Sequence, residues 1–359
     1  MSAESASPAA AGTTSTRSRP QLSPGVRAGL DLARALAAVY VVAYHVLASV
    51  AMPRPLSALF SFGQEAVIVF FLLSGFVIFA NEADRSARPG GYYLRRLRRI
   101  YPPILLAMAL STVLWAFGLI RVDPSLWSAV GTMLSLQDIP TLKPGVVTAP
   151  YLGNDPLWSL SYEVFFYLVF PLVMVAWRRN EQRTRALVPV VAVAAFASYI
   201  FMPNHLSLVI AYFLLWWSGA MAAHVYLRTG TIRVGAVKSE LLGLVSLTLV
   251  ALAGVAVHGW NGAGLFPGLM VRHFAIALLL ALVLVTPART LLGKASLTAA
   301  RPAAAVASVS YGLYVLHYPL LVQPNTQHTA WFLPAVAALI ALAWVADRGL
   351  PKLLPRAPR

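Results

Sequence analysis

The feature that most constrains this chain is a series of apolar runs, each about twenty residues long and bounded by charged residues, proline or glycine. A helical run of that length matches the roughly 30 Å hydrocarbon core of a bilayer. The runs lie near residues 30–50, 63–81, 102–120, 157–177, 187–202, 206–226, 240–258, 271–287, 304–323 and 330–347. The pattern predicts an all-α, polytopic membrane protein with about ten transmembrane helices.

Composition supports this class and excludes others. The 359 residues are 59% hydrophobic and 11% charged, against about 45–50% and 25% in soluble proteins. The formal net charge of +16 could indicate a nucleic-acid partner, but the basic residues cluster between the apolar runs, as in multi-pass membrane proteins. We therefore expect a lipid bilayer and no nucleic acid as partner. The absence of cysteine excludes disulfides, thiolate metal sites and a cysteine nucleophile, and the sequence indicates no metal site.

The distribution of basic residues predicts the orientation. If every run crosses once, 23 of the 28 lysines and arginines fall on one side and four on the other. Cytoplasmic loops carry such an excess, so we expect a multi-pass protein of the cell (cytoplasmic) membrane with both termini in the cytoplasm. Three regions follow: a disordered cytoplasmic tail over 1–26, a ten-helix membrane domain over 27–348, and a basic cytoplasmic tail over 349–359.

The two longest loops differ in character. The outer loop, roughly 121–156, contains several prolines, and we expect a short interfacial helix within it around 124–136. The longest inner loop, 82–101, is dominated by Arg95-Arg96-Leu97-Arg98-Arg99. That cluster fits a positive-inside loop, and it equally suits a polyanionic nucleotide.

Arg34 and His45 are ionisable residues within the first apolar run. A charged side chain inside a membrane is costly and usually functional. Eleven residues make three helical turns with about 20° left over, so both side chains share one face, roughly 16 Å apart along the axis. Two structural alternatives remain for Arg34: its side chain reaches the headgroups, or it pairs with Asp31 at i−3.

Two further ionisable residues, Glu163 and His317, are predicted at the depth of His45. Each lies about five or six residues from the outer end of its run, roughly 8–9 Å below the surface. A carboxylate beside a histidine fixes the tautomer of a general base, so we expect Glu163 to pair with His45. The alternative is a structural Glu163 paired with arginine or backbone donors. His317 suits a structural or substrate-orienting role as well as a catalytic one.

Taken together, five stretches resemble the acyltransferase 3 family of bacterial membrane acyltransferases, from about Leu30 to Trp344. They are Leu30-Asp31 through Arg34 to His45; Val69–Phe76; Leu94-Arg95-Arg96 with Arg99-Ile100-Tyr101-Pro102; Trp158-Ser159-Leu160-Ser161 with Glu163, Tyr167 and Pro171; and Ser310-Tyr311 with Tyr314, Leu316, His317, Pro319 and Leu320. The family's Arg-x10-His signature maps onto Arg34 and His45.

The chain departs from the family's pattern at two places. The acidic residue common two positions before the Phe-Phe pair is Ile68 here, with Glu65 three residues earlier, so no acidic role is transferred to this position. The ending Asp347-Arg348-Gly349-Leu350-Pro351 is left unassigned. We also expect no fused extracytoplasmic esterase-like domain, which some family members carry.

The resemblance implies transfer of an acyl group, typically acetyl, from cytoplasmic acyl-CoA to a hydroxyl of a carbohydrate, a lipid-linked glycan or a macrolide-type metabolite. No permanently bound cofactor is implied; acyl-CoA, expected to be acetyl-CoA, is the donor substrate. CoA should bind at Arg34, with Arg95, Arg96 and Arg99, and its arm should reach His45. His45 then acts as the general base, or alternatively carries the acyl group itself. Ser159, Ser161 or Tyr311 could stabilise the oxyanion.

One hypothesis from another class stays open on the sequence alone. A transporter or flippase for a polar metabolite would also place polar side chains at one depth in the membrane. Such proteins often show inverted repeats and interrupted helices at matching positions, and we find neither pattern in this sequence. Acyl-CoA hydrolysis or transfer by the purified protein would discriminate the two classes.

Overall fold

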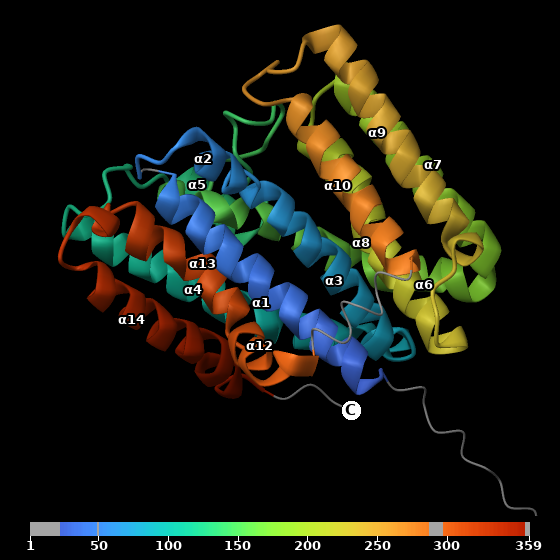
Figure 1. Ribbon diagram of the computed structural model, residues 1–359, viewed down its shortest axis with the longest axis horizontal. Helices are drawn as coiled ribbons and strands as arrows, with labels where there is room; N and C mark the ends of the chain where they lie inside the picture. Colours follow the sequence, from blue (N-terminus) through green and yellow to red (C-terminus); the bar gives the residue numbers. More distant parts are fainter. Residues whose placement is uncertain (1–21, 49, 287–296, 356–359) are drawn as a thin grey trace, which may run out of the picture.

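The computed structural model describes residues 22–48, 50–286 and 297–355, and these are almost entirely helical (Figure 1). In these ranges nine helices are long and apolar enough to cross a membrane, and a bent pair supplies a tenth. The long helices are α1 (Pro24–Leu47), α3 (Gly63–Glu82), α4 (Pro89–Ala116), α6 (Trp158–Arg179), α7 (Glu181–Phe201), α8 (His205–Thr229), α9 (Lys238–His258) and α10 (Gly268–Val285). The ninth span is α14 (Phe332–Trp344) together with the helical turns that continue it to Lys352. The predicted all-α membrane fold is confirmed.

The tenth span is broken. Helices α12 (Ala300–Ala307) and α13 (Ser310–His317) meet at a bend of 52°, and α13 continues into a π-helical turn over Tyr318–Val322. Two short helices, α2 (Arg54–Leu59) and α5 (Leu126–Met133), lie in the loops. The position of α5 matches the short helix expected in the 121–156 loop.

Helix α4 begins thirteen residues earlier than expected, because we took Pro102 as the start of the span. Instead, Pro89 occupies the first turn and the helix continues through Pro102. Tyr92 and Ile100, two helical turns apart, are both buried, so this segment has a core-facing side as well as a basic one. The Arg95–Arg99 cluster therefore lies on a helix and not in a loop.

The expected terminal tails are shorter than predicted. Ser23 caps α1 by accepting a hydrogen bond from the Val26 amide, and Pro24 occupies the first helical position, so residues 24–26 are helical. At the other end, helical turns continue to Lys352. Residues 1–21 and 356–359 of the two tails lie outside the described residues, and the cytoplasmic location of the termini stays a prediction.

Helix α8 forms the centre of the bundle, and all its residues from Ala211 to Val225 are buried. It packs most closely on α3, where Gly75 and Gly219 let the two backbones meet. A Cβ atom at Gly75 would lie 1.8 Å from the Trp216 carbonyl oxygen, and one at Gly219 would lie 1.9 Å from that of Leu72. Small residues permit such close helix packing in membranes.

The remaining helices flank this centre on two sides. Helices α7, α9 and α10 pack together with α8 on one side. On the other side α1 packs between α3 and the α12–α13 pair, with α4 and α14 beyond (Figure 1). The polar residues of α1 therefore face a space bordered by α3, α4, α6 and α13.

Candidate active site

The larger of two neighbouring cavities is basic, and we call it the arginine chamber. It has a volume of about 660 Å³ and is bordered by α1, α3, α4, α6, α13 and the segment after α14. Its charged lining residues are Arg34, Arg95, Arg96, Arg98, Arg99, Arg348, Glu163 and Asp347. Six cations against two carboxylates make this chamber suited to an anionic ligand.

The second cavity contains His45, and we call it the histidine chamber. Its volume is about 300 Å³, and its polar lining residues are Tyr44, His45, Gln64, Thr141, Asp155, Trp158, Tyr314 and Tyr318. Val67 and Tyr314 line both chambers, so the two cavities share a wall. As the spacing of eleven residues predicts, α1 presents Arg34 to one chamber and His45 to the next.

His45, which lines the histidine chamber, contacts the buried side chain of His317. The Nδ1 of His317 lies 2.8 Å from the Tyr314 carbonyl oxygen, and its Nε2 lies 3.1 Å from Nδ1 of His45. A carbonyl oxygen only accepts, so Nδ1 of His317 carries a proton and, in neutral His317, Nε2 is an acceptor. Nδ1 of His45, which also lies 3.0 Å from the Val41 carbonyl oxygen, then donates. In neutral His45 this leaves Nε2 unprotonated, as a general base requires.

The expected pairing of Glu163 with His45 is wrong. Glu163 lines the arginine chamber and accepts hydrogen bonds from Ser74, at 3.2 Å, and from Tyr167. The prediction failed because depth in the membrane does not determine the direction in which a side chain points. Glu163 faces α3, and the residue that contacts His45 is His317. A catalytic role for Glu163 stays a prediction.

The expected donor-binding arginines divide into paired and unpaired groups. Glu82 bridges Arg95, at 2.6 Å, and Arg96, at 3.2 Å. Arg99 pairs with Asp347 at 3.1 Å. Arg34, in contrast, forms no hydrogen bond or ion pair with any residue in the described ranges, although it lines the chamber. Neither headgroup contact nor an Asp31 ion pair is therefore needed to explain its place.

The other predicted lining residues are only partly brought together. Ser159 lines the arginine chamber and its Oγ lies 2.8 Å from the Tyr314 hydroxyl. Tyr311 also lines it, with the Arg99 guanidinium 5.7 Å from its ring centre. Ser161 lines neither chamber, because its hydroxyl turns back along α6 and donates to the Trp158 carbonyl at 2.8 Å. Asp31 lines neither chamber either.

Several polar residues of the site were missed by sequence reasoning. Asp347, left unassigned, is buried and accepts from the Gly312 amide at 2.9 Å as well as from Arg99. Tyr167 could have been paired with Glu163, since residues four apart on a helix are neighbours. Ser74 and Glu82 gave no comparable signal, because their partners lie on other helices.

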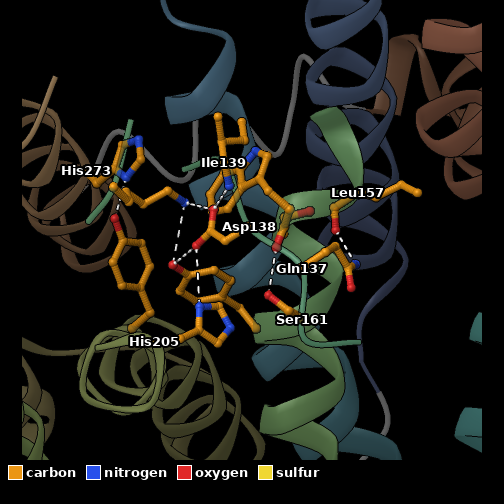
Figure 2. A network of polar contacts seen from close by, with 12 residues as sticks. Gln137, Asp138, Ile139, Leu157, Ser161, His205 and His273 are labelled. Carbon is orange, nitrogen blue, oxygen red and sulfur yellow. Dashed lines mark hydrogen bonds and ion pairs between the residues drawn. The ribbon is translucent and has the colours of Figure 1, made fainter. Parts of the chain in front are cut away.

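A buried ion pair lies within the segment that contributes Ile139, Thr141 and Leu142 to the histidine chamber, and Figure 2 shows the polar contacts around Asp138. The Asp138 carboxylate lies 2.5 Å from the Lys143 ammonium and accepts from the Tyr162 hydroxyl at 2.5 Å. The same ammonium lies 3.7 Å from the ring centre of Trp158. Burial lowers the pKa of Lys143, and the Asp138 charge opposes that shift. Between these two residues lie Ile139, Thr141 and Leu142, which line the chamber.

The fold and these chambers define a class: a multi-pass helical membrane protein with cavities inside the bundle that are lined by ionisable side chains. The family model of the acyltransferase 3 family, described as an acyltransferase domain, matches residues 27–348. The chain therefore belongs to this family. No solved structure shows a significant match.

Three curated relatives illustrate the similarity. Nodulation protein 10 of Rhizobium leguminosarum bv. viciae is 29% identical over 201 residues, 52% of this chain and 53% of that protein. Acyltransferase MdmB of Streptomyces mycarofaciens is 36% identical over 115 residues, 31% and 28% of the two chains. O-acetyltransferase OatA of Staphylococcus aureus is 24% identical over 356 residues, 89% and 55%. The matches thus span about half, or less, of each relative.

Proposed function

We propose that this chain is a membrane O-acyltransferase that moves an acyl group, acetyl in the first instance, from acyl-CoA to a hydroxyl of a carbohydrate, glycan or macrolide-type metabolite. The observation that carries the proposal is the contact between His317 and His45, which lines the histidine chamber. Family membership supports an enzyme over the transporter or flippase considered from the sequence. The names of two relatives, an acyltransferase and an O-acetyltransferase, support the reaction type.

The arginine chamber suits the donor. CoA carries several phosphate charges, and arginine binds phosphate through charge-assisted hydrogen bonds. Arg34 offers its donors without first breaking an ion pair. From there the pantetheine arm would have to extend roughly 16 Å along α1 to bring the thioester to His45. Arg95, Arg96 and Arg99 contribute positive charge, although their carboxylate partners occupy part of their hydrogen-bonding capacity.

The proposed step is direct transfer. Nε2 of His45 takes the proton of the acceptor hydroxyl while its oxygen attacks the thioester carbonyl. The carbon–sulfur bond then breaks, and the His45 proton passes to the departing CoA thiolate, which gives the ester and free CoA. The Ser159 hydroxyl donates to the Tyr314 hydroxyl, which itself donates to the Pro156 carbonyl, so Ser159 could stabilise the oxyanion only after releasing Tyr314. If His45 instead carried the acyl group, labelled acyl-CoA without acceptor would leave label on the protein.

The test is CoA release and ester formation by purified protein supplied with labelled acetyl-CoA and a glycoside. His45→Ala should lower the rate by about 10²–10⁴-fold, the contribution typical of a general base. His328→Ala is the matched control, because His328 is exposed and lines neither chamber. A His45→Ala protein that folds and reacts at the wild-type rate would overturn the mechanism. An absence of acyl-CoA consumption by wild-type protein with every acceptor would favour the transporter.

A further inference from the structure

The charge of the histidine chamber lining is opposite in sign to that of the arginine chamber. Of its polar side chains, Asp155 is the one carboxylate, and the lining includes no lysine or arginine. Two basic residues near its lining are engaged elsewhere: Lys143, over the Trp158 ring, pairs with Asp138, and Arg272, whose charge acts on Tyr44, pairs with Glu65 at 2.7 Å. An anion in this chamber would meet a like charge without a cation to compensate it.

The chamber is also rich in hydrogen-bond acceptors. The Gln64 Oε1 is buried and has no hydrogen-bond partner in the described part of the chain. Asp155 lies beside the Tyr318 hydroxyl, and an ionised carboxylate has about four lone-pair positions to offer. Asp155, Gln64 and His45 thus bring acceptor-bearing side chains to the lining of one cavity. Such a lining matches a ligand that brings hydroxyl donors.

Tyr318 places Asp155 close to the reacting group. Its hydroxyl lies beside Asp155, and its ring meets that of His45 edge-on with centres 5.2 Å apart. Asp155, Tyr318 and His45 all line the same cavity. One ligand in this cavity can therefore offer one hydroxyl to His45 and another to Asp155. The volume of about 300 Å³ is at the lower end for ligand pockets, so a single ring fits better than an oligosaccharide.

We propose that the histidine chamber is an acceptor site selective for an uncharged diol, such as one pyranose ring. In this assignment, which rests on the proposed function, His45 receives the reacting hydroxyl. Asp155 accepts a hydrogen bond from a second hydroxyl, with Gln64 as a further acceptor. Asp155 thereby excludes acceptors that carry a carboxylate or phosphate beside the reacting position. Its role is to bind and select the acceptor.

The natural absence of cysteine allows a test that needs neither acyl-CoA nor turnover. Thr141 lies exposed in the chamber lining, and Thr141→Cys places one thiol there. Its reaction with a cationic and an anionic methanethiosulfonate reagent reports the local charge. Ser57→Cys, on exposed α2 away from both chambers, corrects for reagent reactivity. The corrected rate should favour the cationic reagent roughly tenfold, as expected of one nearby charge at intermediate dielectric.

Asp155 variants and ligand protection complete the test. Asp155→Asn in the Thr141→Cys background should bring the ratio of the two corrected labelling rates, cationic over anionic reagent, to about one. Asp155→Glu keeps the charge and should keep the roughly tenfold ratio. Methyl glucoside should slow labelling, whereas methyl glucuronide should not until Asp155 is neutralised. Equal rates in all backgrounds, or a thiol that neither reagent reaches, would overturn the proposal. Stronger protection by methyl glucosaminide would replace the diol with an ammonium-bearing acceptor.

The test of the diol site can fail or succeed independently of the test of acyl transfer. Labelling and protection can succeed in a protein that transfers no acyl group, which would refute the enzyme and keep the diol site. Conversely, a protein that acylates glycosides while Asp155→Asn changes neither the labelling ratio nor the KM for the acceptor would keep the enzyme and refute the site.

Discussion

Nε2 of His317 lies 3.1 Å from Nδ1 of His45, and this contact joins two helices whose residues are 272 positions apart in the sequence. The direction of the hydrogen bonds is set by the Tyr314 carbonyl, which accepts from the far nitrogen of His317. The buried histidine thus fixes the tautomer of the one that lines the chamber. In many hydrolytic sites a carboxylate does this; here a neutral imidazole does.

His317 should act through His45. His317→Phe removes the acceptor for Nδ1 of His45, and we expect kcat to fall about 10- to 100-fold with little change in the KM for acyl-CoA. His317→Gln, which keeps an acceptor on a side chain of similar reach, should recover part of the rate. The double variant with His45→Ala should be no slower than His45→Ala alone, as for residues that act as a unit. Additive losses in steady-state kinetics would contradict this.

Arg34 should serve the donor. Arg34→Ala removes a cation that forms no ion pair in the described residues, so the fold should persist while the KM for acyl-CoA rises about 10- to 100-fold, the range of a hydrogen bond to a charged group. Arg233→Ala removes an exposed charge outside both chambers and is the control. Kinetics with each substrate varied in turn provide the measurement. A larger effect on the KM for the acceptor would remove Arg34 from the donor site.

Adding a methyl group where α3 and α8 meet should destabilise the protein. Gly75→Ala would place a Cβ 1.8 Å from a backbone oxygen of α8, which cannot be relieved by turning a side chain. We expect a large fall in melting temperature or in the yield of monodisperse protein. Gly90→Ala is matched to it, because a Cβ there meets nothing within 4 Å and alanine favours the helix by about 1 kcal/mol. Equal melting curves for the two variants would refute the close contact.

Removing one partner of the Asp138–Lys143 ion pair should strongly destabilise the protein. Lys143→Met leaves a buried carboxylate without its cation, which typically costs about 3–5 kcal/mol. The double variant Lys143→Met/Asp138→Asn should be more stable than Lys143→Met alone, because the uncompensated charge is gone. Lys238→Met, at an exposed lysine, should change the unfolding free energy by less than about 0.5 kcal/mol. Denaturation in detergent provides the comparison, and an unaffected Lys143→Met would contradict the burial of the pair.

Sequence reasoning located the spans and the two polar positions of α1, because bilayer thickness and helical periodicity act on residues close together in the chain. Arg34 and His45 could be assigned to one face for this reason. The start of α4 was missed because Pro102 was taken as a boundary, although the buried positions Tyr92 and Ile100 already had helical spacing.

The partners of the polar residues could not be predicted in the same way. Depth placed Glu163, His45 and His317 in one layer, but rotation of each helix about its axis decides which of them touch. That rotation depends on packing such as the Gly75–Trp216 contact, which couples distant segments. Asp347 illustrates the same limit: its partners Arg99 and Gly312 lie on two other helices.

The wall between the two chambers, which includes Val67 and Tyr314, has a consequence for the permeability of the membrane. If donor and acceptor occupy the chambers proposed for them, neither molecule has to cross the bilayer, and only the end of the pantetheine arm with its acyl group has to pass this wall. No continuous aqueous path through the protein is then required for turnover. Replacing either wall residue with a smaller one would join the chambers and open a path through which ions could pass.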